Sequence, residues 1–389
     1  MANLLRQQDV MGYRYPFLDL YKVNNMYIGR IKEAAERVIC SGRYVGGHEV
    51  EAMERALAVA CGVPDAYVVG VSSGLDALRL ALRSYMHLGR LAPGDEVIVP
   101  ANTYIATVLA VTDCGLVPVM VEPDVLTMNI DTSLIEGAVT PRTRAVMPVH
   151  LYGRVVWDGM LMDTVRRHNL LVIEDNAQAI GATAPVAGFN GSHISGTLGH
   201  AGAFSFYPTK NVGAMGEAGA VLTFDTQLAE TLRAMRNYGQ SRQYHNELQG
   251  YNCRLDPLQA AIVALKLPEL EFENSSRRAI AGVYDCMIDN PYVSKPIYDG
   301  TGISVWHQYV VRVKDRDRFR DYMAGNGVET AVHYPVPPHK QACYPDMNIL
   351  EFPVAENIAR ECVSLPVSRC TTLSDAEDIS MIINKYRHG

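Results

Sequence analysis

The sequence predicts an α/β protein with a large, mostly parallel sheet, followed by a smaller α+β domain. From about residue 48 to residue 224, short apolar runs alternate with amphipathic helical segments, which is typical of strand–helix–strand units. Runs such as 97–100 and 170–173 are continuously apolar, as expected of parallel strands covered by helices on both faces. From about residue 292 the pattern changes to short strands, a helix and a proline-rich loop, which indicates a second domain.

Local patterns set the expected elements. Apolar residues at helical spacing predict the first helix, and glycine-rich residues 41–47 end it. Helices are expected at about 24–40, 48–61, 72–88, 103–112, 132–138, 159–168, 227–237, 257–267, 269–287 and 315–326, and near residues 355 and 374. Strands are expected at 67–71, 96–100, 117–121, 145–149, 170–173, from residue 204, and at 220–224, 305–313 and 329–333. We therefore expect a large domain over residues 1–270, with an N-terminal arm at 1–23, and a small domain over residues 271–389.

Composition excludes several classes of protein. The 389 residues include 35 Lys and Arg against 42 Asp and Glu, a formal net charge of -7, which argues against nucleic acid or an anionic membrane as the main partner. No apolar run approaches the about 20 residues of a membrane span. Residues 1–11 lack the hydrophobic segment of a signal peptide. The eight cysteines form no CxxC pair, so we expect no metal site and a reducing, cytoplasmic location.

One lysine stands out by its setting. An apolar run from Phe204 leads to Lys210, and glycines follow at 213–219. A buried strand that enters a tight loop would place the amine in dry surroundings, where its pKa falls. Such an amine can attack a carbonyl and form a Schiff base. On this stretch alone, an ordinary surface lysine in a loop is an equally good interpretation.

Other polar residues follow the predicted strands, where ligands of parallel sheets bind. Ser73 and Gly74 open a helix whose free N–H groups favour a phosphate, although each also fits a plain helix cap. Tyr104 can stack on a flat ring or fill the core. Asp175 can keep a pyridine nitrogen protonated, or it can be an exposed loop acid. Together with Lys210, these residues provide the contacts that pyridoxal phosphate requires.

The sequence also resembles the DegT/DnrJ/EryC1/StrS family of pyridoxal-phosphate-dependent aminotransferases, over about residues 17–386. The resemblance implies an aspartate-aminotransferase-like domain of fold type I and action on nucleotide-linked keto sugars. It rests on SGLDAL (73–78), VPANTYIAT (99–107), PVHLYG (148–153), EDNAQ (174–178), SFYPTKN (205–211), NCRLD (252–256) and HYPVPPH (333–339).

The resemblance also implies roles for matching residues. Lys210 would be the Schiff-base lysine and proton carrier, and Asp175 the partner of the pyridine nitrogen. Gln178 would lie near the phenolic oxygen of the cofactor, and Tyr104 would stack on its ring. Leu75 departs from the pattern, because many members have threonine there, which puts one phosphate hydrogen bond in doubt. The implied phosphate ligands are Ser73, Gly74, the backbone of Leu75, Ser205, and Asn252 from the other subunit of a homodimer.

The substrate is predicted less sharply. The loop 333–339 resembles members that aminate C3 of a nucleotide-linked 3-keto sugar, so we expect a dTDP-3-keto-6-deoxyhexose, with L-glutamate as amino donor. C4 amination, sugar dehydration and a catalytically silent sensor or binding protein are the alternatives. Lys210 argues against dehydration, because dehydratases of the family carry histidine there, and the occupied catalytic positions argue against a silent protein. Candidate sugar or nucleotide contacts are Arg43, Tyr44, Tyr207, Arg242, Tyr334 and His339, where either arginine fits a solvated surface charge equally well.

Overall fold

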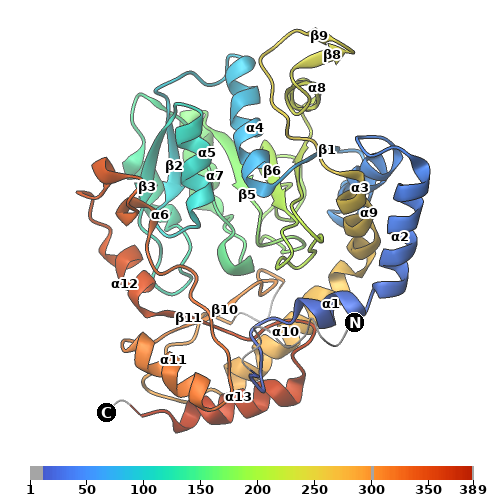
Figure 1. Cartoon of the computed structure of the whole chain (residues 1–389). Helices are drawn as coiled ribbons and strands as arrows, with labels where there is room; N and C mark the ends of the chain where they lie inside the picture. Colours follow the sequence, from blue (N-terminus) through green and yellow to red (C-terminus); the bar gives the residue numbers. More distant parts are fainter. Residues whose placement is uncertain (1–11, 299–301, 388–389) are drawn as a thin grey trace.

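A seven-stranded sheet forms the centre of the molecule (Figure 1). The computed structural model describes residues 12–298 and 302–387. The strand order is β1-β7-β6-β5-β4-β2-β3, and β7 runs in the direction opposite to the other six strands. The strands are β1 (Tyr67–Val71), β2 (Glu96–Pro100), β3 (Val117–Val121), β4 (Thr143–Val146), β5 (Leu171–Asp175), β6 (Ala201–Ser205) and β7 (Gly219–Thr223).

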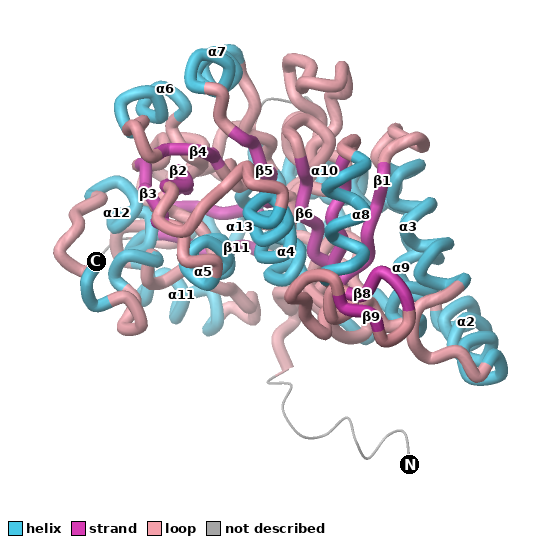
Figure 2. Tube along the Cα trace, turned by 90° about the horizontal axis from the view of Figure 1, so that it is seen from above, coloured by secondary structure: helices cyan, strands magenta, loops and turns pink. Residues whose placement is uncertain are grey.

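Helices cover both faces of this sheet, as Figure 2 shows from above. Alternate strand residues point to opposite faces. Accordingly Val97, Val99 and Ile173 pack with α4, α5 and α8, whereas Ile98 and Val172 pack with α7 on the other side. The covering helices are α3 (His48–Ala60), α4 (Gly74–His87), α5 (Ile105–Asp113), α6 (Thr132–Ile135), α7 (Gly159–His168), α8 (Thr226–Met235) and α9 (Pro257–Lys266). Helix α2 (Ile28–Ser41) packs against α9 rather than against the sheet.

A second core surrounds a small antiparallel sheet of β10 (Tyr309–Arg312) and β11 (Cys362–Leu365). Tyr15, near the start of the described chain, packs into this core. Helix α10 joins the two cores, because Leu270 belongs to the large one and Tyr284 to the small one. The division of the chain near residue 270 stays a prediction. The helices of this part are α10 (Leu270–Met287), α11 (Arg316–Gly325), α12 (Pro353–Glu361) and α13 (Leu373–Lys385).

Most predicted elements are present, and the differences have local causes. The run at 204 is the end of β6, which begins three residues earlier at small residues. The strand predicted at 305–313 is confined to 309–312, because Trp306 has a φ of 48° and breaks the extended run. The strand predicted at 329–333 is reduced to one bridge between Ala331 and Ser364. The elements not predicted are α1 (Leu20–Asn25), β8 (Gln240–Arg242), β9 (His245–Asn246) and β11.

No helix in residues 12–298 and 302–387 is long and apolar enough to cross a bilayer. The expectation about a signal segment concerns residues 1–11, which lie outside the described residues.

Candidate active site

The loop after β6 presents Lys210. Its main chain folds back on itself, because Ala214 N donates to Phe206 O at 2.8 Å and Lys210 N donates to Tyr207 O at 2.8 Å. A Cβ atom on residue 213 would lie 2.3 Å from Pro208 O, so glycine is required where the two arms of the loop cross. The loop therefore has a defined shape that fixes where the lysine leaves the backbone.

Lys210 and Asp175 influence each other electrostatically. Burial lowers the pKa of Lys210 to about 8, and the negative charge of Asp175 opposes this shift. Asp175 ends β5, the strand beside β6, so both residues emerge at the same edge of the sheet. A lysine with this pKa has a substantial neutral fraction near pH 8, as a nucleophilic amine and proton acceptor needs.

Asp175 is a buried carboxylate, 5% exposed, with two hydrogen-bond donors. Thr107 Oγ1 donates to its Oδ2 at 2.8 Å, and Ala177 N donates to its Oδ1 at 3.2 Å. Burial raises the pKa of Asp175, while these donors and the charge of Lys210 lower it. A cation next to this carboxylate would favour its ionised form, and a protonated pyridine nitrogen is such a cation.

The N-terminus of α4 lies against the end of β6. Ser73 caps α4, and its Oγ accepts a hydrogen bond of 3.1 Å from Asp76 N. A Cβ atom on residue 74 would lie 2.6 Å from Ser205 Cβ, so Gly74 allows the helix end to approach the serine. The free N–H groups of the first helical turn and the Ser205 hydroxyl thus lie together, which is a suitable donor set for a phosphate.

Gln178 connects this edge of the sheet to the loop 333–339. Its Oε1 accepts a hydrogen bond of 2.6 Å from Tyr152 N, so its Nε2 is the donor that reaches Tyr334 Oη at 3.0 Å. Burial raises the pKa of Tyr334, so its hydroxyl stays protonated at neutral pH. The Tyr334 ring lies 5.1 Å from the ring of Tyr104, which is 52% exposed. Tyr104 therefore has an open surface on which a planar group could stack.

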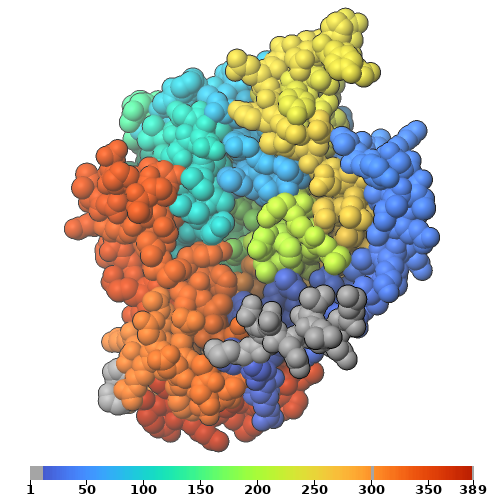
Figure 3. Space-filling view, viewed as in Figure 1, coloured from blue at the N-terminus to red at the C-terminus, as the bar shows by residue number. Residues whose placement is uncertain are grey.

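The remaining predicted residues are dispersed. Tyr207 is exposed and accepts the backbone hydrogen bond from Lys210 N. The yellow-green segment of the chain, to which the loop after β6 belongs, reaches the surface near the middle of the face in Figure 3. Leu75 lies in the first turn of α4, next to Gly74. His339 is fully enclosed, and its Nε2 lies 3.1 Å from Glu356 Oε1, so it has no free surface in this subunit for a sugar. The other predicted contacts are exposed and lie elsewhere in the sequence: Arg43 and Tyr44 in the loop after α2, Arg242 at the end of β8, and Asn252 between β9 and α9.

Two supporting features were not predicted. Thr107 ends the motif VPANTYIAT (99–107), and its hydroxyl contacts Asp175. Glu174 points to the opposite face of β5 and is completely buried. It accepts hydrogen bonds from the backbone N–H groups of Gly196, Leu198 and Gly199 at 2.7–2.8 Å and pairs with His150 Nε2 at 2.8 Å. Two adjacent acids at the end of a buried strand could have indicated these different roles, because successive residues of a strand point to opposite faces of the sheet.

Two histidines near Lys210 are held neutral. Burial lowers the pKa of His333 to about 4, and the charge of Lys210 adds to that effect. Burial and the same charge keep the pKa of His307 well below its usual value. Neither imidazole therefore competes with Lys210 as a cation near neutral pH.

These residues fit pyridoxal phosphate. The helix end with Gly74 and Ser205 suits the phosphate, Asp175 the pyridine nitrogen, Tyr104 the ring face, and Lys210 the aldehyde. When bound, the group supplies an aldehyde carbon that takes up amino groups and an electron-withdrawing ring that stabilises a carbanion next to it. The fold and the site together define a pyridoxal-phosphate-dependent transferase of fold type I.

Comparison with known proteins agrees with this class. The model of the DegT/DnrJ/EryC1/StrS aminotransferase family matches residues 27–384, and the chain belongs to that family. A dTDP-3-amino-3,6-dideoxy-alpha-D-galactopyranose transaminase of Aneurinibacillus thermoaerophilus is 46% identical over 95% of this chain and 99% of its own length. DesV of S. venezuelae, in complex with a ketimine intermediate, is 41% identical, has a TM-score of 0.88 and aligns over 96% and 98% of the two chains. NtdA of Bacillus subtilis with bound cofactor PMP is 30% identical, has a TM-score of 0.85 and aligns over 98% and 87%.

Proposed function

We propose that the protein aminates C3 of a dTDP-linked 3-keto-6-deoxyhexose, with L-glutamate as amino donor. The observation that carries this proposal is the 46% identity, along almost the whole of both chains, to a transaminase named for a dTDP-3-amino-3,6-dideoxy sugar. The contact between Gln178 and Tyr334 supports it, because it joins the loop 333–339 to the edge of the sheet that carries Asp175.

In this proposal Lys210 is the catalytic residue. Its Nζ removes the proton from Cα of the amino-acid donor and, in the second half of the reaction, delivers a proton to the sugar carbon that gains the amine. The lowered pKa of Lys210, about 8, suits both tasks, because the group can accept and release a proton near neutral pH. Asp175 would hold the pyridine nitrogen of the cofactor, and Tyr104 and Gln178 would contact its ring.

The phosphate would be held by the first turn of α4, with Ser73, Gly74 and the backbone of Leu75, and by the Ser205 hydroxyl. The Ser73 hydroxyl already caps its helix, so its contribution is to shape the helix end. On the substrate side, Tyr207 and Tyr334 are the contacts that the geometry favours, since they lie beside Lys210 and Gln178.

We further propose a homodimer with shared sites and a cytoplasmic location. Asn252 is exposed and Tyr104 is half exposed, so both have surface for contacts from outside this subunit. The test is complementation: Lys210→Ala and Asn252→Ala subunits, each inactive alone, should regain about a quarter of the wild-type activity when refolded together as a statistical mixture of dimers. Failure of the mixture to regain activity would reject the shared site.

Product analysis tests the substrate. The purified enzyme with pyridoxal phosphate and glutamate is offered dTDP-linked 3-keto and 4-keto sugars, and the amino sugar is located by NMR. Amination at C3 supports the proposal. Amination at C4 would replace it with the C4 alternative, and the absence of any amino sugar, with cofactor bound, would favour a silent binding protein.

A further inference from the structure

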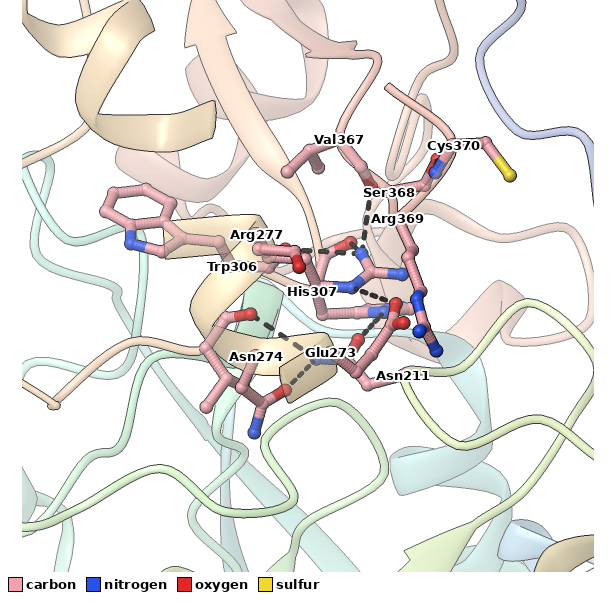
Figure 4. A network of polar contacts seen from close by, with 12 residues as sticks. Asn211, Glu273, Asn274, Arg277, Trp306, His307, Val367, Ser368, Arg369 and Cys370 are labelled. Atoms are coloured by element: carbon pink, nitrogen blue, oxygen red, sulfur yellow. Dashed lines mark hydrogen bonds and ion pairs between the residues drawn. The ribbon is translucent and has the colours of Figure 1, made fainter. Parts of the chain in front are cut away.

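Asn211, the residue after Lys210, lies at the centre of a polar network that connects three parts of the chain (Figure 4). Its Nδ2 donates to Asn274 Oδ1 of α10 at 2.9 Å and to the backbone oxygen of Val305 at 3.3 Å. Its Oδ1 lies 3.1 Å from His307 Nδ1. Asn274 is completely buried and His307 is 4% exposed, so water has little access to these groups.

The direction of each hydrogen bond in this network is determined. Asn274 Nδ2 donates to Ile180 O at 2.9 Å, which leaves Asn274 Oδ1 as the acceptor for Asn211. Asn211 Oδ1 is then an acceptor, and His307 Nδ1 must carry the hydrogen. Because each group has a single compatible role, the Asn211 side chain has one favourable orientation.

Helix α10 also fixes the segment that carries His307. Arg277, one turn beyond Asn274, is 3% exposed, and its Nε pairs with Glu273 at 3.0 Å. Its guanidinium donates to the backbone oxygens of Trp306 at 3.4 Å, His307 at 3.3 Å and Val367 at 2.9 Å. Both partners of Asn211 are therefore attached to the same helix, one directly and the other through Arg277.

A separate contact holds the other side of the loop. Lys266, at the end of α9, donates to Gly213 O at 2.5 Å and to Asn24 Oδ1 of α1 at 2.7 Å. The loop that carries Lys210 is thus attached to the continuous α9–α10 segment at two points. These are Asn211, one residue after Lys210, and Gly213, three residues after it.

We propose that Asn211 is a positioning residue for Lys210, and that Asn274 and His307 hold Asn211 in the orientation that the transamination reaction requires. In the proposed function the Lys210 amine would have to reach the aldehyde carbon of the cofactor and carry protons at a defined position in every cycle. An error of about 1 Å in its position can lower the rate about 100-fold. This inference rests on the proposed catalytic role of Lys210.

The test compares variants that differ in one hydrogen bond. Asn274→Leu removes the acceptor for Asn211, and His307→Leu removes the donor, whereas His307→Asn keeps a donor near the position of Nδ1. Asn290→Leu is the matched control, because Asn290 is also buried and donates to two backbone oxygens, those of Ile383 and Tyr386, within the small core. Urea unfolding of each apo variant identifies changes that are merely destabilising.

Two measurements report on Lys210. In the apo protein, the pH dependence of Lys210 acetylation by acetic anhydride, followed by mass spectrometry, gives the pKa of the amine. In the holoenzyme, kcat and KM are measured for glutamate and the sugar. Asn274→Leu and His307→Leu should raise the midpoint of acetylation, because a displaced amine is better hydrated, and should lower kcat about 10- to 100-fold with little change in KM. His307→Asn should recover most of kcat.

Wild-type acetylation profiles in Asn274→Leu and His307→Leu would overturn the inference, as would an equal loss of kcat in Asn290→Leu. The proposed function has a separate control. If Lys210→Ala retained transaminase turnover, the catalytic role of Lys210 would fail, and the positioning role would fail with it. A fully inactive Lys210→Ala, together with unaffected Asn274→Leu, would reject only the positioning role.

Discussion

Thr107 Oγ1 donates a hydrogen bond of 2.8 Å to Asp175 Oδ2, and Thr107 is itself 2.8 Å from Thr103 Oγ1. Thr103 precedes Tyr104, the N-cap residue of α5, and Thr107 lies in the first turn of that helix. The segment that carries Tyr104, the proposed stacking residue, therefore also supplies a hydrogen-bond donor to the Asp175 carboxylate. A hydrogen-bond donor stabilises the ionised form of a carboxylate, and in the proposed site this negative charge faces the pyridine nitrogen of the cofactor.

Thr107→Val should weaken cofactor binding and slow turnover. The variant keeps the shape of the side chain and leaves Asp175 Oδ2 without its donor, so the pKa of Asp175 should rise further. Loss of a hydrogen bond to a charged group costs about 1.5–3 kcal/mol, which corresponds to about 10- to 150-fold in the affinity for pyridoxal phosphate. Equilibrium dialysis of pyridoxal phosphate against the apo protein measures this affinity. Thr112→Val on the same helix, whose hydroxyl contacts Tyr344, should bind the cofactor normally.

Gly74→Ala should damage the proposed phosphate-binding end of the site. The new Cβ would lie 2.6 Å from Ser205 Cβ and force the end of α4 away from β6, at a cost of about 1–3 kcal/mol in the free energy of unfolding. Inorganic phosphate should also no longer compete with pyridoxal phosphate for binding to this variant. Gly29→Ala, in α2 with open space around the new methyl group, should instead be neutral or stabilising by up to about 1 kcal/mol. Equal effects of the two substitutions would contradict the close packing of Gly74.

Lys266 should make stability depend on pH. Burial lowers its pKa from 10.5 to about 8, so between these values the unfolded chain binds a proton that the folded protein does not. The free energy of unfolding should therefore rise with pH through this window, by up to about 1.4 kcal/mol per pH unit, and the contribution is lost as pH falls toward 8. Denaturant titrations of the wild type and Lys266→Met from pH 7 to pH 10.5 isolate the effect. Parallel curves for the two proteins would show that Lys266 titrates normally.

Tyr334→Phe should affect the sugar more than the amino donor. It removes the acceptor of Gln178 Nε2 and keeps the ring that contacts Tyr104. We expect KM for the keto sugar to rise about 5- to 15-fold, from loss of one hydrogen bond of about 1–1.5 kcal/mol, with an unchanged half-reaction with glutamate. Stopped-flow measurement of each half-reaction separates them. Tyr322→Phe, which loses a hydroxyl bonded to Ile382 O in the small core, serves as control.

The residues that follow strands could be predicted from the sequence to lie near one another, because parallel strands bring their carboxyl ends to one edge of the sheet. Lys210, Asp175 and Gly74 were predictable on that ground. The support behind them was not. Asn274 is one polar residue on an amphipathic helix, and its partner Asn211 is 63 positions away in the chain, so no local pattern links the two.

The strands could be predicted where the apolar run in the sequence is continuous. The strand β11 was missed because four residues after a helix carry too little pattern, and its pairing with β10 spans tens of residues. His339 illustrates the converse limit. The motif suggested a substrate contact, but the enclosure of its ring by Phe352 and Glu356 depends on tertiary packing that no motif records.

The visible absorption spectrum tests the central claim most directly. Wild-type protein reconstituted with pyridoxal phosphate should show a visible absorption band from the covalent link to Lys210, and L-glutamate should bleach it as the amino group is transferred. Lys210→Ala should not form this band. A wild type that binds the cofactor without such a band, or a Lys210→Ala protein that retains both the band and its bleaching by glutamate, would contradict the assignment of Lys210 as the catalytic residue.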